Sequence, residues 1–134
     1  MSRYALDTNI ITPILKENKK LQNRIYEEAK RGARIVIPAI VYYEIKRGLI
    51  DCKATAKLME FEKHCGTLGI DDIDVATLNK AAIIYATLKQ TGRPIDDADI
   101  LIAASCIVHN YTLVTDNTSH LGRVDGLQFV NWAE

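Results

Sequence analysis

Cysteines and long apolar runs are scarce in this sequence, and their scarcity argues against several classes of protein. The three cysteines, Cys52, Cys65 and Cys106, are odd in number and form no Cys-x-x-Cys pair, so they support neither a disulfide framework nor a zinc knuckle. No apolar stretch reaches the ~20 residues of a membrane span, and no signal-peptide apolar region follows the initial methionine. We therefore expect a soluble, cytoplasmic protein with no membrane contact.

The motifs of nucleotide cofactors and of acyl transfer are also missing. The chain contains neither Gly-x-x-x-x-Gly-Lys-Ser/Thr nor Gly-x-Gly-x-x-Gly, and none of its serines lies in a Gly-x-Ser-x-Gly motif. It has no His-Glu-x-x-His, and its 3 histidines are scattered. These absences leave a nucleotide cofactor, an acyl-transfer serine and a histidine-based metal site without support.

No charge of one sign dominates, which argues against a strongly basic protein that coats nucleic acid. The chain carries 17 basic and 17 acidic residues, but residues 1–50 have a net charge of +5 and residues 51–134 a net charge of −5. These basic residues either solvate helix faces or rim an acidic pocket and attract a polyanion. The candidates for such a rim are Lys16, Lys19, Lys20, Lys46 and Arg47.

A chain of 134 residues with 48% hydrophobic content fits one domain, residues 1–134, with its own core. Short strand-like runs alternate with longer runs of helical periodicity. This alternation predicts an α/β fold with a mainly parallel central sheet of four to five strands, flanked by helices on both faces. We predict strands at residues 4–6, 34–37, 112–115 and 127–130, a weaker strand near 67–70, and helices at 9–16, 21–31, 40–49, 54–64, 75–90 and 97–109, several ended by Gly32, Gly66 or Gly92.

Four acidic residues lie where such a fold binds ligands. Asp7 and Asp116 directly follow predicted strands, while Glu44 and Asp99 lie near the starts of predicted helices. Because ligands bind outside the carboxyl ends of parallel strands, we expect all four to face one crevice. Ionised carboxylates that converge beside apolar elements need a cation or protons to coexist. Oxygen ligands favour Mg²⁺ or Mn²⁺, so the pattern predicts metal-assisted phosphoryl chemistry.

Each acid also has a simpler interpretation when it is taken alone. Asp7 suits the N-cap of the helix that follows it. Glu44 interrupts an apolar run, where a glutamate is rare unless paired, and Arg47 is a fair ion-pair partner three residues on. Asp116 suits a turn in which side chains bind the backbone. Four acids at topologically matching places nevertheless favour one shared site.

Three aspartates crowd the start of the helix predicted at 97–109. Asp96, Asp97 and Asp99 all complement the helix dipole there, but one capping carboxylate would suffice. We assign the cap to Asp96 and the chemistry to Asp99, because Asp99 adjoins the apolar face of the helix.

Five groups of residues follow one another along the chain in an order and spacing that resembles the PIN-domain ribonucleases. The resemblance is greatest to the VapC-type toxins of bacterial and archaeal toxin–antitoxin pairs. The similarity spans nearly the whole chain. The motifs are Leu6-Asp7-Thr8-Asn9, Tyr43-Glu44 with Arg47-Gly48, Gly92-Arg93-Pro94-Ile95 followed by Asp99-Ile100-Leu101-Ile102-Ala103-Ala104, Leu113-Val114-Thr115-Asp116-Asn117, and the ending Gly126-Leu127 with Asn131-Trp132.

The resemblance implies a PIN-like fold and an endoribonuclease, the toxin of a toxin–antitoxin pair, that depends on Mg²⁺ or Mn²⁺. Asp7, Glu44 and Asp99 correspond to the family's metal-binding acids, and Asp116 is the fourth candidate for metal binding and catalysis. We expect Asp7 and Asp99 to be direct ligands, and Glu44 and Asp116 to act through waters or a second ion. The resemblance further implies an RNA substrate such as a tRNA, a cognate VapB-type antitoxin and a homodimer.

The chain departs from the family pattern at two positions, and both concern the fourth ligand. Many relatives have an acid two residues after the strand threonine, where this chain has Asn117, with Asp116 one place earlier. Relatives often have glycine where this chain has Asp96. Asp116, Asn117 and Asp96 therefore compete for the fourth place.

Two rival functions remain open. A metal-dependent phosphatase would use Asp7 as a covalent nucleophile, but it predicts a second acid two residues on, where this chain has Asn9. A non-catalytic PIN-like protein that binds RNA or regulates would retain the fold alone. The presence of Asp7, Glu44 and Asp99 together argues against it.

Overall fold

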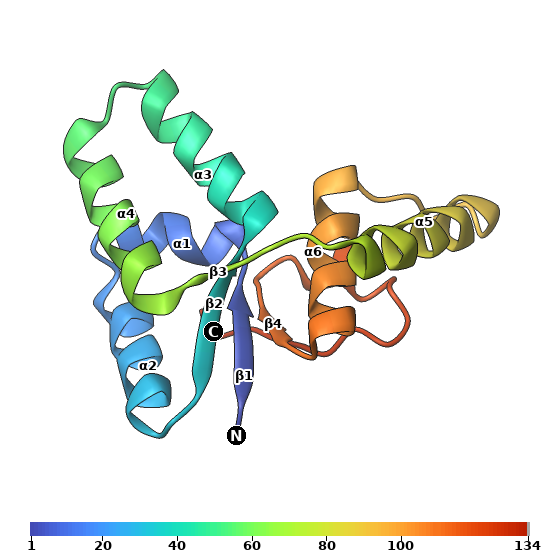
Figure 1. The fold of residues 1–134 in the computed structure, drawn as a ribbon, viewed down its shortest axis with the longest axis horizontal. Coiled ribbons are helices and arrows are strands. Elements are labelled where there is room, and N and C mark those ends of the chain that lie inside the picture. Colours follow the sequence, from blue (N-terminus) through green and yellow to red (C-terminus); the bar gives the residue numbers. More distant parts are fainter. Residues whose placement is uncertain (134) are drawn as a thin grey trace.

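A parallel sheet of five strands forms the centre of the computed structural model, which describes residues 1–133 (Figure 1). Every strand pair is parallel, and Ala5 lies opposite both Val36 and Leu113. The predicted parallel sheet is confirmed, but the weak strand expected near 67–70 is displaced: Thr67 and Leu68 belong to a helix, and the strand begins at Ile70, directly after Gly69. In spatial order the strands are β3 (Ile70–Asp71), β2 (Arg34–Pro38), β1 (Arg3–Leu6), β4 (Thr112–Val114) and β5 (Phe129–Val130).

Helices cover both faces of this sheet, as predicted. Helices α1, α2 and α4 lie on one side and α5 and α6 on the other, while α3 rises from the carboxyl end of β2 (Figure 1). Among residues 1–133, no helix is long and apolar enough to cross a bilayer. The helices are α1 (Thr8–Leu15), α2 (Lys19–Lys30), α3 (Ala39–Asp51), α4 (Thr55–Leu68), α5 (Val75–Gln90), α6 (Asp97–His109) and α7 (Thr118–Leu121).

The end of α4 corrects one expectation about the glycines. Gly66 was expected to end this helix, but it lies inside α4, which continues to Leu68. Gly69 takes the left-handed conformation that ends the helix, with φ 96°. A glycine inside a helix costs only about 1 kcal/mol relative to alanine, and the packing of buried Cys65 and Phe61 outweighs that cost. Gly32 and Gly92 follow α2 and α5 with positive φ, as expected.

The core is built from the two faces of the sheet. Leu6 on β1 shares one apolar face with Ile14 of α1, Ile25 of α2 and Phe61 of α4. On the other face lies α6, whose central residues, from Ile102 to Cys106, are all buried. This burial on both sides explains why the strands read as continuous apolar runs rather than as alternating ones.

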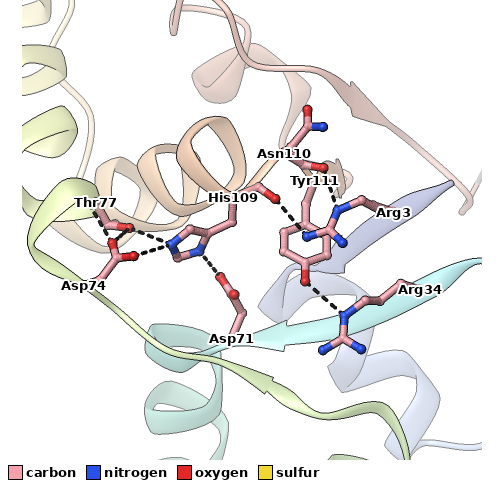
Figure 2. A network of polar contacts seen from close by, with 8 residues as sticks. All are labelled: Arg3, Arg34, Asp71, Asp74, Thr77, His109, Asn110 and Tyr111. Carbon is pink, nitrogen blue, oxygen red and sulfur yellow. Dashed lines mark hydrogen bonds and ion pairs between the residues drawn. The ribbon is translucent and has the colours of Figure 1, made fainter. Parts of the chain in front are cut away.

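His109, at the last turn of α6, ties three elements together (Figure 2). Its Nδ1 lies 2.7 Å from a carboxylate oxygen of Asp71 in β3, and its Nε2 lies 2.8 Å from a carboxylate oxygen of Asp74, the N-cap of α5. The hydrogen bond with Asp71 and that with Asp74 raise the pKa of His109 against the opposing effect of burial. Hydrogen bonds from Thr77 and His109 hold the pKa of Asp74 well below its usual range.

The contacts of His109 predict a dependence of stability on pH. Because the pKa of folded His109 lies above its ordinary 6.5, its ion pairs stabilise the fold fully below pH 6.5, and this contribution is lost as the pH rises through the raised pKa. We expect the Tm to fall over that range and His109→Gln to flatten the fall, as followed by circular dichroism. His120→Gln, at an exposed position, is the control; equal flattening by both variants would contradict the assignment.

Candidate metal and catalytic site

Asp7 lies at the carboxyl end of β1 and is almost fully buried, with 3% of its surface exposed. Its Oδ1 accepts a hydrogen bond of 2.7 Å from the backbone N–H of Thr8, and its Oδ2 accepts one of 2.8 Å from the Thr115 hydroxyl. Asp7 therefore is the N-cap of α1, as its simpler interpretation held. Burial raises the pKa of Asp7; the bonds from Thr115 and Thr8 oppose the rise, and the negative charges of Glu44 and Asp116 add to it.

Glu44 extends from α3 toward Thr8, the residue next to Asp7. Its Oε1 accepts a hydrogen bond of 3.1 Å from the Thr8 hydroxyl. The proposed partner Arg47 instead places its guanidinium carbon 5.0 Å from the centre of the Tyr43 ring, and no Glu44–Arg47 ion pair occurs among the residues described. The ion-pair interpretation of Glu44 is thus wrong, because Glu44 turns toward the start of α1.

Asp99 reaches the same place from the first turn of α6. Its carboxylate is partly buried. Burial is the main cause that raises the pKa of Asp99, followed by the negative charges of Asp7, Asp96 and Glu44, while His120 lowers it. Three elements that are far apart in the sequence thus bring Asp7, Glu44 and Asp99 close enough to repel one another. We call these three side chains the acidic site.

The residues that compete for the fourth place have different surroundings. Asp116 is exposed, and its backbone N–H donates a bond of 3.0 Å to the side-chain oxygen of Asn9. Asn117 donates from its side-chain amide to a carboxylate oxygen of Asp99 at 3.4 Å. Asp96 occupies the N-cap position of α6 but makes no capping hydrogen bond with its side chain, so the cap predicted for it is absent. Its exposed carboxylate is left to water.

These surroundings yield a prediction about the fourth ligand. Asn117→Ala should weaken Mn²⁺ binding about tenfold, because groups that orient a metal ligand typically contribute that much. Asp116→Asn should have a smaller effect, since its exposed carboxylate influences Asp7 only through charge. Titrating Mn²⁺ against the activity of each variant measures both effects. Asp96→Asn is the third arm, and a weakened response confined to it would contradict this order.

Hydroxyl and amide side chains hold the acidic site in place. The Thr115 hydroxyl, fully buried, donates to Asp7 and accepts the backbone N–H of Asn117 at 3.0 Å. Asn9 donates to Thr115 at 3.3 Å and to Asp7 at 3.4 Å. The roles of Thr8 and Thr115 escaped the sequence analysis, although both adjoin predicted acids. His120 had no signal at all, because α7 was not predicted.

The donor set of the acidic site fits a hard divalent cation. Asp7, Glu44 and Asp99 offer only oxygen, repel one another and form no ion pair with Lys or Arg among the residues described. Within residues 1–133 no three His, Cys, Asp or Glu side chains stand close enough to count as a ready-made metal cluster. Binding of a cation at the acidic site therefore stays a prediction.

The basic rim is smaller than the sequence suggested. Lys46 turns away to Glu62, with 3.1 Å between its Nζ and a carboxylate oxygen, and Lys19 lies within 3.5 Å of the Gln22 side-chain oxygen. Lys16 borders a hollow that also contains Glu44. Of these three lysines, only Lys16 lies beside the acidic site.

Comparison with known proteins finds relatives along nearly the whole chain. The sequence profile of the PIN domain matches residues 4–127. The chain is 31% identical over 123 residues to Ribonuclease VapC1 of Methanocaldococcus jannaschii, covering 92% of this chain and 82% of that protein. It is 28% identical over 134 residues to the tRNA(fMet)-specific endonuclease VapC of Shigella flexneri, covering 99% and 100%. The crystal structure of VapBC2 from Rickettsia felis, bound to a DNA fragment from its promoter, contains a chain that matches with a TM-score of 0.90 and 29% identity over 97% of this chain and 98% of that one.

Proposed function

The chain belongs to the PIN domain family, and on that premise we propose that it is an Mg²⁺- or Mn²⁺-dependent endoribonuclease that acts in the cytoplasm as the toxin of a toxin–antitoxin pair. One observation carries the proposal: Asp7, Glu44 and Asp99 converge from three separate elements, and within residues 1–133 none of them forms an ion pair with a lysine or arginine. The M. jannaschii relative, a ribonuclease, and the S. flexneri relative, a tRNA-specific endonuclease, support it.

In this proposal Asp7 and Asp99 would hold the divalent ion, and Glu44 and Asp116 would contribute negative charge beside it. The bound ion supplies Lewis-acid stabilisation of the charge that builds on the phosphate oxygens. Thr115 and Thr8 fix the direction of the Asp7 carboxylate, and Asn117 that of Asp99. Glu44, held by Thr8, would orient the attacking water. The water oxygen bonds to phosphorus as the P–O3′ bond breaks, and a proton from the water passes to the leaving O3′, which leaves a 3′-hydroxyl and a 5′-phosphate.

Cleavage of RNA tests this function directly. Purified protein should cut a tRNA when Mg²⁺ or Mn²⁺ is present, and the cutting should stop in EDTA. We choose tRNA because the S. flexneri relative is named for it. Since the chain has no net charge, RNA must be recognised by local contacts and shape rather than by bulk charge. Full cleavage in EDTA would rule out the role of the metal.

A cognate VapB-type antitoxin is the partner that we propose. Helices α1, α2 and α4 border an apolar hollow of about 260 Å³, whose wall includes Tyr26, itself 63% exposed, and Ile25. A helix of a partner protein would bury this surface, as in other helix-in-groove complexes. VapBC complexes among the similar structures support this partner.

The product of a neighbouring gene should therefore copurify with this chain, and Tyr26→Asp should weaken the complex. The proposed homodimer has a separate candidate surface on α5, where Val75, Leu78 and Tyr85 are exposed. Light scattering, which measures the molar mass in solution, should show a dimer for the wild type and a monomer for Leu78→Glu. A monomeric wild type that captures no such protein would contradict both assignments, although the nuclease would stand.

The rival functions gain little from the structure. Asn9, which stands where a phosphatase needs its second acid, uses its side chain to join Thr115, Asp7 and the backbone of Asp116. A non-catalytic RNA-binding relative would have no need for the mutually repelling carboxylates of the acidic site. Cleavage, rather than binding alone, distinguishes it from the nuclease.

A further inference from the structure

A second hollow, of about 340 Å³, adjoins the acidic site on the side of α1 and α3. Glu44 of the acidic site belongs to its wall, together with Thr8, which donates a hydrogen bond to Glu44. From Glu44 the wall continues along α3 through Gly48 to Cys52, the residue that directly follows the helix, at spacings of four residues that keep all three on one side. Eight residues of helix rise about 12 Å, so this side hollow leads well away from the metal ligands.

The side hollow has two kinds of lining. Apolar side chains of Leu15, Ile45 and Leu49 form part of its wall. Two exposed lysines, Lys16 at the end of α1 and Lys57 in the first turns of α4, also border it. Neither lysine takes part in any ion pair among residues 1–133. The hollow thus offers uncompensated positive charge beside an apolar wall and a cluster of carboxylates.

We propose that the side hollow is a nucleotide subsite, which holds the part of the RNA substrate next to the cleaved phosphate. The apolar wall takes a base, and Lys16 and Lys57 take neighbouring phosphates. This inference rests on the proposed nuclease function, since the scissile phosphate would lie at the acidic site. A strand of RNA suits this lining because it alternates apolar bases with anionic phosphates. In a chain with no net charge, local cations of this kind are what RNA binding requires.

Gly48 keeps the side hollow open. It lies inside α3, where glycine is less favourable than residues with a side chain, and a Cβ built on it would meet nothing within 4 Å. A larger side chain therefore has room to enter the hollow without a clash. Gly66, inside α4, is equally free of neighbours but does not line the side hollow. The two glycines form a matched pair for a test.

Gly48→Leu and Gly66→Leu should both raise the Tm, by about 3 °C each, because both remove a helical glycine. Only Gly48→Leu should weaken binding of a short fluorescein-labelled single-stranded RNA, measured by anisotropy in EDTA, and raise the KM for cleavage with little change in kcat. A merely structural role of Gly48 would leave affinity and KM unchanged. Equal RNA affinity of the two variants overturns the subsite.

The lysines are tested through the dependence of binding on salt. The double variant Lys16→Gln/Lys57→Gln should bind this RNA about tenfold more weakly and lower the slope of log K against log salt by about 1.4, since each phosphate contact with a single strand contributes about 0.7. Lys63→Gln, an exposed lysine of α4 outside the side hollow, should leave the slope unchanged. A slope that does not fall in the double variant contradicts the phosphate contacts.

Cys52 serves as a probe inside the side hollow. It is exposed, whereas Cys65 and Cys106 are buried, and burial raises the pKa of both buried thiols, that of Cys65 to about 11. Maleimide should therefore alkylate Cys52 first. With the labelled RNA in EDTA at ten times its Kd, alkylation of Cys52 should slow about tenfold. Unslowed alkylation in the presence of bound RNA overturns the subsite.

These outcomes separate the subsite from the nuclease. RNA that binds and protects Cys52 but is never cut with Mn²⁺ would end the proposed nuclease and leave the subsite. Cleavage with a wild-type KM in Gly48→Leu and in the double lysine variant would end the subsite and leave the nuclease. If these variants lose a copurifying protein and keep their RNA affinity, the side hollow binds protein, and the subsite is again overturned.

Discussion

Asp7→Asn and Asp99→Asn are each expected to lower the rate of RNA cleavage at least ~100-fold, the usual loss when one preorganised electrostatic group is removed. Both side chains face the acidic site, and each contributes to the repulsion that a cation offsets. The measurement is kcat on a labelled RNA with saturating Mg²⁺. Asp97→Asn is the matched control, because Asp97 lies in the same first turn of α6 but is exposed.

Misfolding would not explain this loss. Asparagine is nearly as good an N-cap as aspartate, so Asp7→Asn should keep the start of α1. It also removes a buried carboxylate whose pKa is raised by desolvation, which offsets the loss of one acceptor for the hydrogen bonds from Thr115 and Asn9, so the metal-free variant should keep the wild-type fold in circular dichroism. Undiminished cleavage by either variant, or equal loss in Asp97→Asn, would refute the assigned roles.

Mn²⁺ is expected to raise the Tm of the wild type strongly and that of Asp99→Asn much less. A ligand present at 100 times its Kd stabilises the folded state by about 2.7 kcal/mol through mass action, which corresponds to roughly 5–10 °C for a chain of this size. The variant has lost one carboxylate of the acidic site and therefore binds the ion more weakly. Differential scanning fluorimetry with and without Mn²⁺ measures both shifts.

EDTA and Asp97→Asn are the controls of this experiment. EDTA should return the Tm of the wild type to its metal-free value, and Asp97→Asn should shift as the wild type does. Equal shifts in wild type and Asp99→Asn would mean that Asp99 is no ligand. Because this readout needs no RNA, it tests the metal site even if the natural substrate is not the one assayed.

The strongly periodic parts of the chain could be read from the sequence. The limits of α5 and α6 agree with the predicted helices at 75–90 and 97–109, since Asp74 and Asp96 mark their starts and Gly92 follows the first of them. The end of α4 was misplaced because glycine is permitted inside a helix and only its φ decides whether the helix stops. Helix α7, with 4 residues, was too short to show a period.

Part of the candidate site could likewise be predicted from the sequence, and part could not. Asp7, Glu44 and Asp99 were expected to meet because parallel strands direct their carboxyl ends to one edge of the sheet, and the structure brings them together. The fourth position could not be decided, because neighbouring residues point in different directions and a turn after Thr115 sets which one faces inward. In the structure Asn117 contacts Asp99, and Asp116 is exposed.

By itself the sequence determined the α/β class, the order of the strands and of the helices other than α7, and the three acids that meet at the site, because apolar periodicity and residue chemistry are local properties. Only the tertiary structure decided how these acids are held and what lies beside them. The hydrogen bond from Thr115 to Asp7 joins residues 108 positions apart, and the side hollow forms where α1, α3 and α4 pack. Such contacts depend on strand register and helix packing, which no short stretch of sequence contains.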